Sequence, residues 1–229
     1  MQRMMKAYPL FIAMGAMIVV AAVVIGAINA GNANAYYAVD KVTRESELAW
    51  ASVRAGVEST VIWLPYFRFL GLAMILGGIT MALGIIANKL LQLGREVNAN
   101  IPAKARVEVP AKPRSAMMRL FMMLGMMIIL IGFIIALVTA GTAASVYSNP
   151  VVQLDAAPTG SALLQDLASV HRAGSWLEAF KFVGVATLVL GIISGLSTII
   201  FALQFQKMAI PEVVHKLPAA MVPAPASGD

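Results

Sequence analysis

The sequence predicts an all-α membrane protein with four transmembrane helices, built as two parallel two-helix repeats with amphipathic helices in the two outer loops. Two observations predict this fold class. The chain is 60% hydrophobic and 12% charged with a mean hydropathy of +0.82, whereas globular proteins contain about 25% charged residues. Segments of the first half also recur in the second half, which is typical of membrane proteins built from two similar halves.

Four stretches free of charge are each close to the roughly 20 residues that cross a hydrocarbon layer as a helix. They are Leu10 to Ala30, Phe69 to Ala87, Leu120 to Gly141 and Phe182 to Phe205. Strands of a β-barrel would alternate in short segments, and lipid forces each span to satisfy its own backbone groups. We therefore expect transmembrane helices at 10–30, 67–90, 119–141 and 180–205.

The first span has an alternative interpretation as a cleaved signal peptide, because Ala33-Asn34-Ala35 resembles a cleavage site and Arg3 and Lys6 precede the apolar run. The apolar run is longer than the roughly 7 to 15 residues of a signal sequence. It also has an internal counterpart in the third span. We expect this segment to be retained as a helix.

The internal repeat is clearest where the second and fourth spans begin. Phe67-Arg68-Phe69-Leu70-Gly71-Leu72-Ala73 recurs 113 positions later as Phe180-Lys181-Phe182-Val183-Gly184-Val185-Ala186. At an offset of 110, Leu10-Phe11, Gly15, Ala30-Gly31 and Tyr37 recur as Leu120-Phe121, Gly125, Ala140-Gly141 and Tyr147. The predicted organisation is a first repeat at 1–100, a basic cytoplasmic linker at 101–116, a second repeat at 117–207 and an extended Pro/Ala-rich cytoplasmic tail at 208–229.

The outer loops carry apolar residues at spacings of three and four, which predicts an amphipathic helix at 39–61 and another at 161–176. The side chains of Trp50, Trp63, Tyr66 and Trp176 are expected at headgroup depth as an aromatic belt. Arg68 and Lys181 occupy equivalent positions at the outer starts of the second and fourth spans. They are lipid or interface candidates, either as snorkelling side chains or as ligands of an anion or a lipid phosphate.

Charge in the connecting segments predicts the orientation. Eleven of the 17 Lys and Arg residues lie in the N-terminal segment, the central loop and the tail, which together carry +7, whereas the two outer loops carry −1. By the positive-inside rule both termini face the cytoplasm of a multi-pass protein in the plasma (inner) membrane. The basic charge is therefore explained by topology, and no basic motif interleaved with aromatics indicates nucleic-acid binding. The central basic loop is a further candidate for contact with anionic lipid heads.

Small residues recur every fourth position on three spans and predict helix-packing faces. The candidates are Ala22, Gly26, Ala30, Gly132, Ala136, Ala140, Gly191 and Gly195. We expect the first and third spans to pack on each other through these faces, or one of the faces to receive a helix of another subunit.

The sequence gives little sign of chemistry. It has no Cys, which removes thiolate catalysis and Cys-ligated metal sites. His171 and His215 lie on opposite sides of the membrane in the predicted topology, and no span has an ionisable residue in its interior, where proton relays and coupled pumps usually carry one. We expect no enzyme activity, no catalytic residue, no cofactor and no metal.

Two weaker patterns have a functional and a structural interpretation. Met118, Met122 and Met126 form one stripe of a Met cluster, which suits either a Cu(I) relay or adaptable packing, and packing is favoured because no His or Cys accompanies it. His171 beside Arg172 is either a metal ligand or a solvated loop residue, and the second is the commoner case.

The favoured function is a non-catalytic accessory or scaffold subunit of a larger energy-converting or oxidoreductase membrane complex, with other integral-membrane subunits and membrane lipids as partners. One alternative is a small transporter or channel for a neutral or apolar solute. Its path would be lined by Asn29, Thr80, Thr139, Ser194 and Thr198. A second alternative is an enzyme that acts on lipids or quinones near Arg68, Lys181 and His171.

Overall fold

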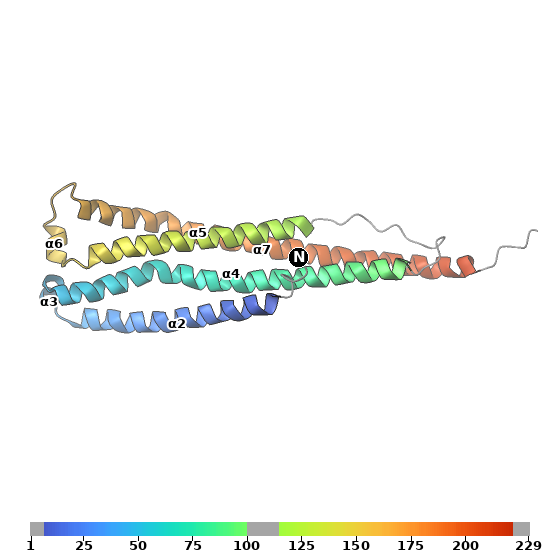
Figure 1. Cartoon of the computed structure of the whole chain (residues 1–229), viewed down its shortest axis with the longest axis horizontal. Coiled ribbons are helices and arrows are strands. Elements are labelled where there is room, and N and C mark those ends of the chain that lie inside the picture. The colour runs from blue at the N-terminus through green and yellow to red at the C-terminus, as the bar shows by residue number, and fades with distance from the viewer. Residues whose placement is uncertain (1–6, 100–114, 222–229) are drawn as a thin grey trace, which may run out of the picture.

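The chain forms a long bundle of helices, seen in a computed structural model that describes residues 7–99 and 115–221 (Figure 1). Every regular element in these ranges is a helix. The elements are α2 (Tyr8–Ala38), α3 (Lys41–Ser46), α4 (Leu48–Ala99), α5 (Ser115–Tyr147), α6 (Val151–Asp155) and α7 (Ala162–Met221). Four of them, α2, α4, α5 and α7, are long and apolar enough to cross a membrane. The described part of the chain is therefore all-helical, with four candidate membrane spans.

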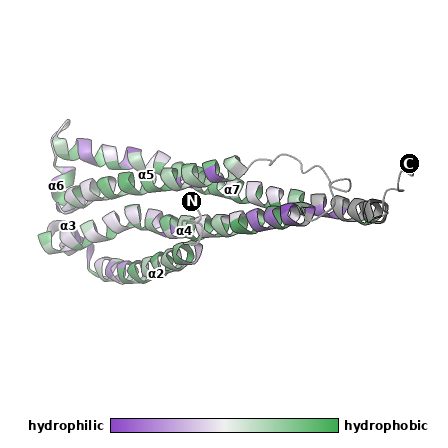
Figure 2. Cartoon of the chain, turned by 45° about the vertical axis from the view of Figure 1, so that its right-hand side comes forward, coloured by the Kyte–Doolittle hydropathy of each residue, from purple (hydrophilic) through white to green (hydrophobic). Residues whose placement is uncertain are grey.

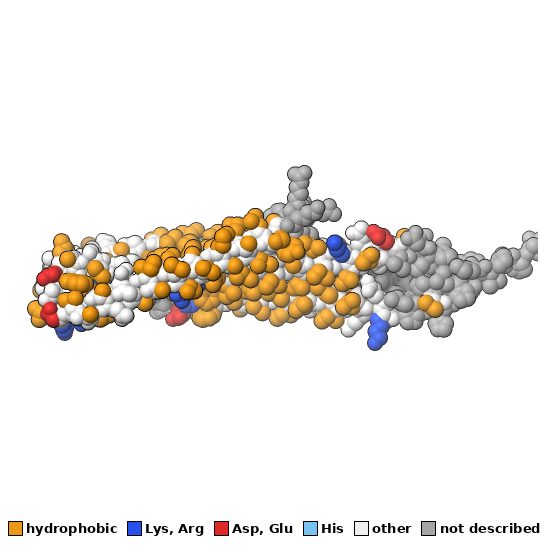
Figure 3. Space-filling view, turned by 90° about the horizontal axis from the view of Figure 1, so that it is seen from below, with side chains coloured by type: hydrophobic (Ala, Val, Ile, Leu, Met, Phe, Trp, Pro, Cys, Tyr) orange, Lys and Arg blue, Asp and Glu red, His pale blue; other side chains and the backbone are white. Residues whose placement is uncertain are grey.

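The four long helices lie side by side, and the short helices α3 and α6 lie against each other at one end of the bundle (Figure 1). At the opposite end α4 and α7 continue beyond α2 and α5. Hydrophobic residues dominate the middle of the long helices, and hydrophilic residues gather toward the ends (Figure 2). The same apolar belt is visible as a continuous orange surface in the space-filling view (Figure 3).

The expected outer amphipathic helices are not separate elements. Residues 39–61 divide between the short helix α3 and the first part of α4, which continues through Pro65 into the apolar span. Residues 161–176 likewise fall almost entirely in the first turns of α7. A proline inside a helix removes one backbone hydrogen bond, but packing against neighbouring helices lets a membrane helix continue through it.

The C-terminal part of the chain also differs from the sequence prediction. Residues 208–221, expected as an extended tail, continue α7 as helix despite Pro211 and Pro218. The predicted basic linker at 101–116 lies almost wholly outside the described residues, as do residues 222–229 of the tail.

Consecutive long helices pack on one another, α2 on α4, α4 on α5 and α5 on α7, and α4 also packs on α7. The expected pairing of the first and third spans is wrong, because their small faces meet other helices. Gly26 of α2 faces Leu64 and Arg68 of α4, while Gly132 of α5 faces Tyr66 of α4 and Phe180 of α7. Close approach to a large side chain needs a small residue on one partner only, so two small faces need not meet each other.

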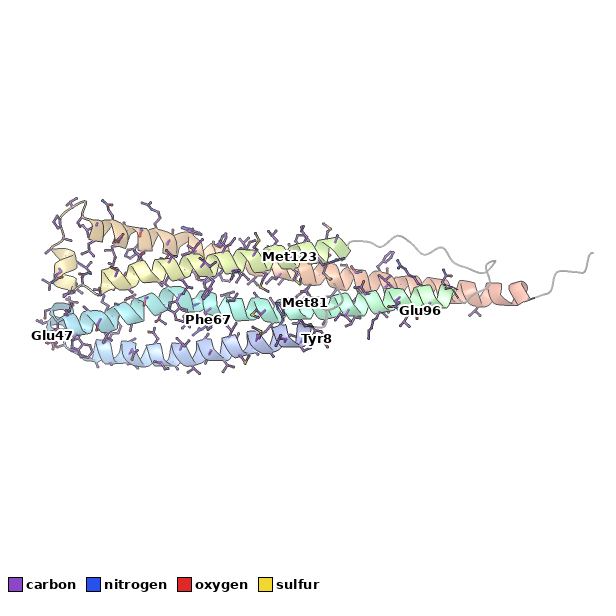
Figure 4. The ribbon with its side chains drawn as sticks, in the orientation of Figure 1. Tyr8, Glu47, Phe67, Met81, Glu96 and Met123 are labelled. Carbon is purple, nitrogen blue, oxygen red and sulfur yellow. The ribbon has the colours of Figure 1, made fainter. Side chains whose placement is uncertain are left out.

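The core lies where α4, α5 and α7 meet. Ala73, Ile129 and Leu188 are each 0% exposed and form one cluster, with Met122 and Met126 packed against it. A second cluster nearer the α3 and α6 end contains Tyr66, Ala136 and Leu177. Figure 4 shows Tyr8, Met81 and Met123 at one level of the bundle, with Phe67 nearer to α3 and Glu47 at the far end.

Candidate functional site

The small residues predicted to pack helices lie mostly at helix interfaces. Ala22 and Ala136 are 0% exposed and Ala140 is 5% exposed. The glycines Gly132, Gly191 and Gly195 are buried, and Gly26 is half-buried. Ala30 of α2 is exposed, so it does not pack against another helix as predicted.

Two glycines bring the backbones of α2 and α4 into close contact. A Cβ built on Gly15 would lie 2.6 Å from the carbonyl oxygen of Gly71, and one built on Gly71 would lie 2.8 Å from the carbonyl oxygen of Gly15. One on Gly78 would lie 3.1 Å from the carbonyl oxygen of Tyr8 and 2.6 Å from Cγ1 of Ile12. The two backbones therefore approach to a distance that only glycine permits.

Helices α5 and α7 repeat these contacts at the sequence offsets of 110 and 113. A Cβ on Gly125 would lie 2.9 Å from the carbonyl oxygen of Gly184, as one on Gly15 meets Gly71. A Cβ on Gly191 would meet the carbonyl oxygen of Met118 at 3.5 Å and the backbone nitrogen of Met122 at 3.4 Å. Their counterparts at Gly78 are the carbonyl oxygen of Tyr8 and the backbone nitrogen of Ile12, which lies 3.3 Å from a Cβ built there.

Of the glycines in these close contacts, only Gly191 is among the packing candidates chosen from the sequence. Gly15, Gly71 and their counterparts Gly125 and Gly184 do not follow a GxxxG spacing, so the usual small-residue pattern does not select them. The internal repeat was the signal that would have found them, because all four belong to its matched positions.

The methionine stripe of α5 packs against glycines of the neighbouring helices. The Cε of Met126 lies 3.2 Å from a Cβ built on Gly77, and Sδ of Met118 lies 3.0 Å from one built on Gly195. Met118 is 7% exposed, and Met122 packs against the core cluster. The stripe thus fills the space left by glycines, which is the packing role of a flexible thioether side chain.

Aromatic side chains of α4, α5 and α7 contact one another, and we name this group the aromatic collar: Trp63, Tyr66, Phe67, Phe69, Phe133, Trp176, Phe180 and Phe182. Trp63 and Phe67 make an edge-to-face pair with ring centroids 5.7 Å apart. Trp176 and Phe180, which lie 113 positions later, make the same kind of pair at 5.9 Å. Trp63 is half-buried and Trp176 is 43% exposed, while Trp50 is half-buried near the start of α4.

The aromatic collar holds Lys181 between its rings. The ammonium nitrogen lies 5.4 Å from the ring centroids of both Phe69 and Phe182 and 3.1 Å from Oε1 of Glu178, and the side chain is 11% exposed. Arg68, at the equivalent position of α4, is exposed and extends its guanidinium over Gly26 of α2. The two predicted interface cations therefore do not converge on one site: Lys181 lies at the α4 and α7 interface and Arg68 at the α2 and α4 interface.

Further polar contacts join the first half of the chain to the second. The hydroxyl of Tyr66 donates a buried hydrogen bond to the backbone carbonyl of Leu177, joining α4 to α7. The guanidinium carbon of Arg54 lies 4.8 Å from the ring centroid of Tyr147, joining α4 to α5. Sequence reasoning did not identify these partners, because they are separated by about a hundred residues and share no motif.

The polar residues proposed as a solute path do not line one continuous face. The hydroxyls of Thr80 and Thr198 donate to carbonyls of their own helices, Leu76 and Ser194, at 2.8 and 2.9 Å. Asn29 donates to the carbonyl of Val57 at 3.5 Å, between α2 and α4. Along α4 and α5 the apolar core cluster that contains Ala73 and Ile129 lies between Thr80 and Thr139.

His171 is exposed on the first turns of α7. Among the residues that the structure describes, no three His, Cys, Asp or Glu side chains come together in a group that would hold a metal ion. Comparison with protein-family models, with curated proteins and with solved structures finds no match.

Proposed function

We propose that the protein is a non-catalytic integral-membrane subunit that scaffolds a larger membrane complex. The observation that carries the proposal is the presence of exposed apolar side chains on parts of the bundle that project beyond the length of a bilayer. Where such side chains gather outside the lipid, they mark a contact surface for another protein.

The projection follows from the lengths of the helices. Helix α4 has 52 residues and α7 has 60, which at 1.5 Å per residue gives roughly 78 and 90 Å. The hydrocarbon core of a bilayer is only about 30 Å thick. In α4, residues 69–88 carry no charge and match that thickness, so the roughly twenty residues of α4 that precede them extend about another 30 Å outside.

Exposed apolar residues mark this outer part. Val42 is 78% exposed, Leu48 69% and Val152 59%, and all three lie on or beside the short helices α3 and α6 at the end of the bundle. Single exposed apolar residues are common on soluble surfaces, but these come from both halves of the chain and gather at one end. This end is the surface that we assign to a partner subunit.

We further propose that the chain consists of two similar helix pairs, α2 with α4 and α5 with α7. The matched contacts of Gly15 with Gly71 and of Gly125 with Gly184 support two helix pairs of the same design, as do the paired rings of Trp63 and Trp176. Because each pair crosses the membrane twice, the two pairs share one orientation. This differs from the inverted repeats that enclose the substrate site of many transporters.

The proposed orientation places the ends of α4 and α7 that extend past α2 and α5 in the cytoplasm of a cell with this protein in its plasma membrane. The supporting observation is the excess of Lys and Arg in the N-terminal segment, the central loop and the tail. The outer end with α3 and α6 then faces away from the cytoplasm.

Affinity purification of the full chain from its own membrane tests the accessory role. Extraction in a mild detergent is expected to retain at least one other integral-membrane protein in a fixed ratio. Replacing Val42 and Leu48 together by Ser is expected to lower that ratio, because it removes apolar contact area at the outer end, whereas Val138→Ser and Met127→Ser in the lipid-facing belt serve as the matched control. Recovery of the native chain and of the control variant without any other membrane protein would overturn the accessory role.

A further inference from the structure

Helix α7 exposes a face whose counterpart on α4 is buried. On α4 the residues that face the second half of the chain include Tyr66, Ala73, Thr80 and Ala87, which are at most 5% exposed. The residues 113 positions later on α7 are all exposed. In order, Tyr66, Ala73, Gly77, Thr80, Gly84 and Ala87 correspond to Ala179, Ala186, Leu190, Ile193, Ser197 and Ile200.

The other face of α7 behaves as its counterpart does. Gly71 and Gly78 of α4 are buried against α2, and their counterparts Gly184 and Gly191 are buried against α5. The difference between the halves is therefore confined to one face. On α4 this face is covered by the second half of the chain, and on α7 nothing within the described chain covers it.

Helix α2 shows the complementary difference. Only 11% of the most apolar stretch of α2 is buried inside the bundle, against 22% of the corresponding stretch of α5 and 33% of that of α4. Its counterpart α5 packs on two helices, α4 and α7, whereas α2 packs on α4. Met126 and Phe133 of α5 make contact with α4, and their counterparts Ala16 and Val23 on α2 are exposed.

We propose that a second copy of the chain binds here, with its α2 lying on the exposed face of α7 as α5 lies on α4 within one chain. The inference rests on the duplicated architecture of the proposed function and not on the accessory role. The established interface between the two halves supplies the template, and the two unpartnered faces are the two sides of that same interface.

The side chains at the proposed contact are complementary in size. Within the chain, the long Met126 of α5 fills the space over Gly77 of α4, with Cε 3.2 Å from a Cβ built there. At the counterpart position between chains, the small Ala16 would face the large Leu190. The large and small residues have exchanged sides, so the pair keeps a similar combined volume, which is the substitution that a packed interface tolerates best.

The contact is head-to-tail, because it joins α2 of one copy to α7 of another. Repeated head-to-tail contacts generate closed rings or open rows. Both halves run in the same direction through the membrane, so each added copy keeps the orientation of the last. The assembly therefore extends in the membrane plane.

Crosslinking in membranes tests this contact, and the chain contains no Cys, so introduced thiols are the only ones in the protein. The double variant Ala16→Cys with Leu190→Cys, treated with a short thiol-specific crosslinker before extraction, is expected to give a ladder of dimer, trimer and higher species. Each single variant alone is expected to stay monomeric, and co-expression of the two single variants is expected to stop at the dimer. Gly77→Cys with Met126→Cys is the matched control and is expected to crosslink within one chain.

Three results would overturn the inference. The first is a double variant that stays monomeric while the Gly77 and Met126 control crosslinks. The second is a Leu190→Cys single variant that forms dimers as efficiently as the double variant, since that requires a symmetric contact between two α7 helices. The third is a crosslink from Leu190→Cys to a different protein, which would leave the accessory role intact. By contrast, a ladder of this chain recovered without any other protein would support the contact between copies and count against the accessory role.

Discussion

Gly15 of α2 and Gly71 of α4 approach so closely that a Cβ on Gly15 would lie 2.6 Å from the carbonyl oxygen of Gly71. The atom in the way belongs to the backbone of the facing helix, so a side-chain rotation cannot relieve the clash. This contact brings the two helices of the first half together, and its counterpart at Gly125 and Gly184 does the same in the second half.

Gly15→Ala is expected to destabilise the protein by about 1 to 3 kcal/mol, the usual cost of overpacking a close contact. Unfolding of the purified protein in detergent, followed by the loss of helical circular dichroism, measures the change. Gly31→Ala in the same helix is the matched control, because a Cβ there meets nothing within 4 Å. Alanine is the better helix former, so the control is expected to be as stable as the native protein or slightly more stable. Equal losses for both variants would show that the close contact is not the cause.

Gly125→Ala is expected to cost about as much as Gly15→Ala, because its Cβ would lie 2.7 Å from Cγ of Leu188 and 2.9 Å from the carbonyl oxygen of Gly184. Gly141→Ala, with open space around the new methyl group, is the control in the same helix. The same detergent unfolding experiment applies. A large loss at Gly15 with none at Gly125 would argue against two halves that pack alike.

Tyr66→Phe removes the hydroxyl that donates to the carbonyl of Leu177 while keeping the ring in the second core cluster. The loss of one buried hydrogen bond between α4 and α7 is expected to cost about 1 kcal/mol. Denaturant unfolding measures it, and Tyr37→Phe is the control, because that ring is 60% exposed and keeps its contact with Arg44. An unchanged midpoint for Tyr66→Phe would remove this bond from the forces that join the two halves.

The side chain of Asp40 caps the N-terminus of α3, where it accepts a hydrogen bond from the backbone N–H of Thr43. The pKa of Asp40 lies below its ordinary value of 3.8. The largest cause is a hydrogen bond from the side chain of Thr43, and the next is a hydrogen bond from the backbone N–H of Thr43. A lowered pKa in the folded state means that the cap is fully present above pH 3.8 and is lost as the pH falls through the lower, folded value. Thr43→Ala is expected to move the pKa of Asp40 up toward 3.8, measured from the NMR shift of its carboxyl carbon. Thr159→Ala is the control, and an unmoved pKa in Thr43→Ala would contradict this origin of the shift.

The membrane spans were predictable from the sequence because a run such as 69–87 is long, apolar and uncharged, and such a run has few structural alternatives. The continuation of α4 through Pro65 was not predictable in the same way, since proline usually ends a helix and only the packing around it decides otherwise. The same holds for the passage of α7 through Pro211.

The contacts between helices were harder to predict from the sequence than the spans themselves. Gly26 and Gly132 were recognised as packing residues, but their partners Arg68 and Tyr66 lie on α4, a large residue against a small one. Small-residue patterns identify a face without naming the opposing helix. The link between Arg54 and Tyr147 depends on the register of α4 against α5, which only the folded bundle fixes.

Native mass spectrometry of the protein extracted from its own membrane tests the accessory role most directly. We expect particles in which this chain is bound to at least one different integral-membrane protein in a constant ratio, and that dissociate to release the intact chain. Particles that contain this chain and lipid alone, under conditions that preserve other complexes of the same membrane, would contradict the account.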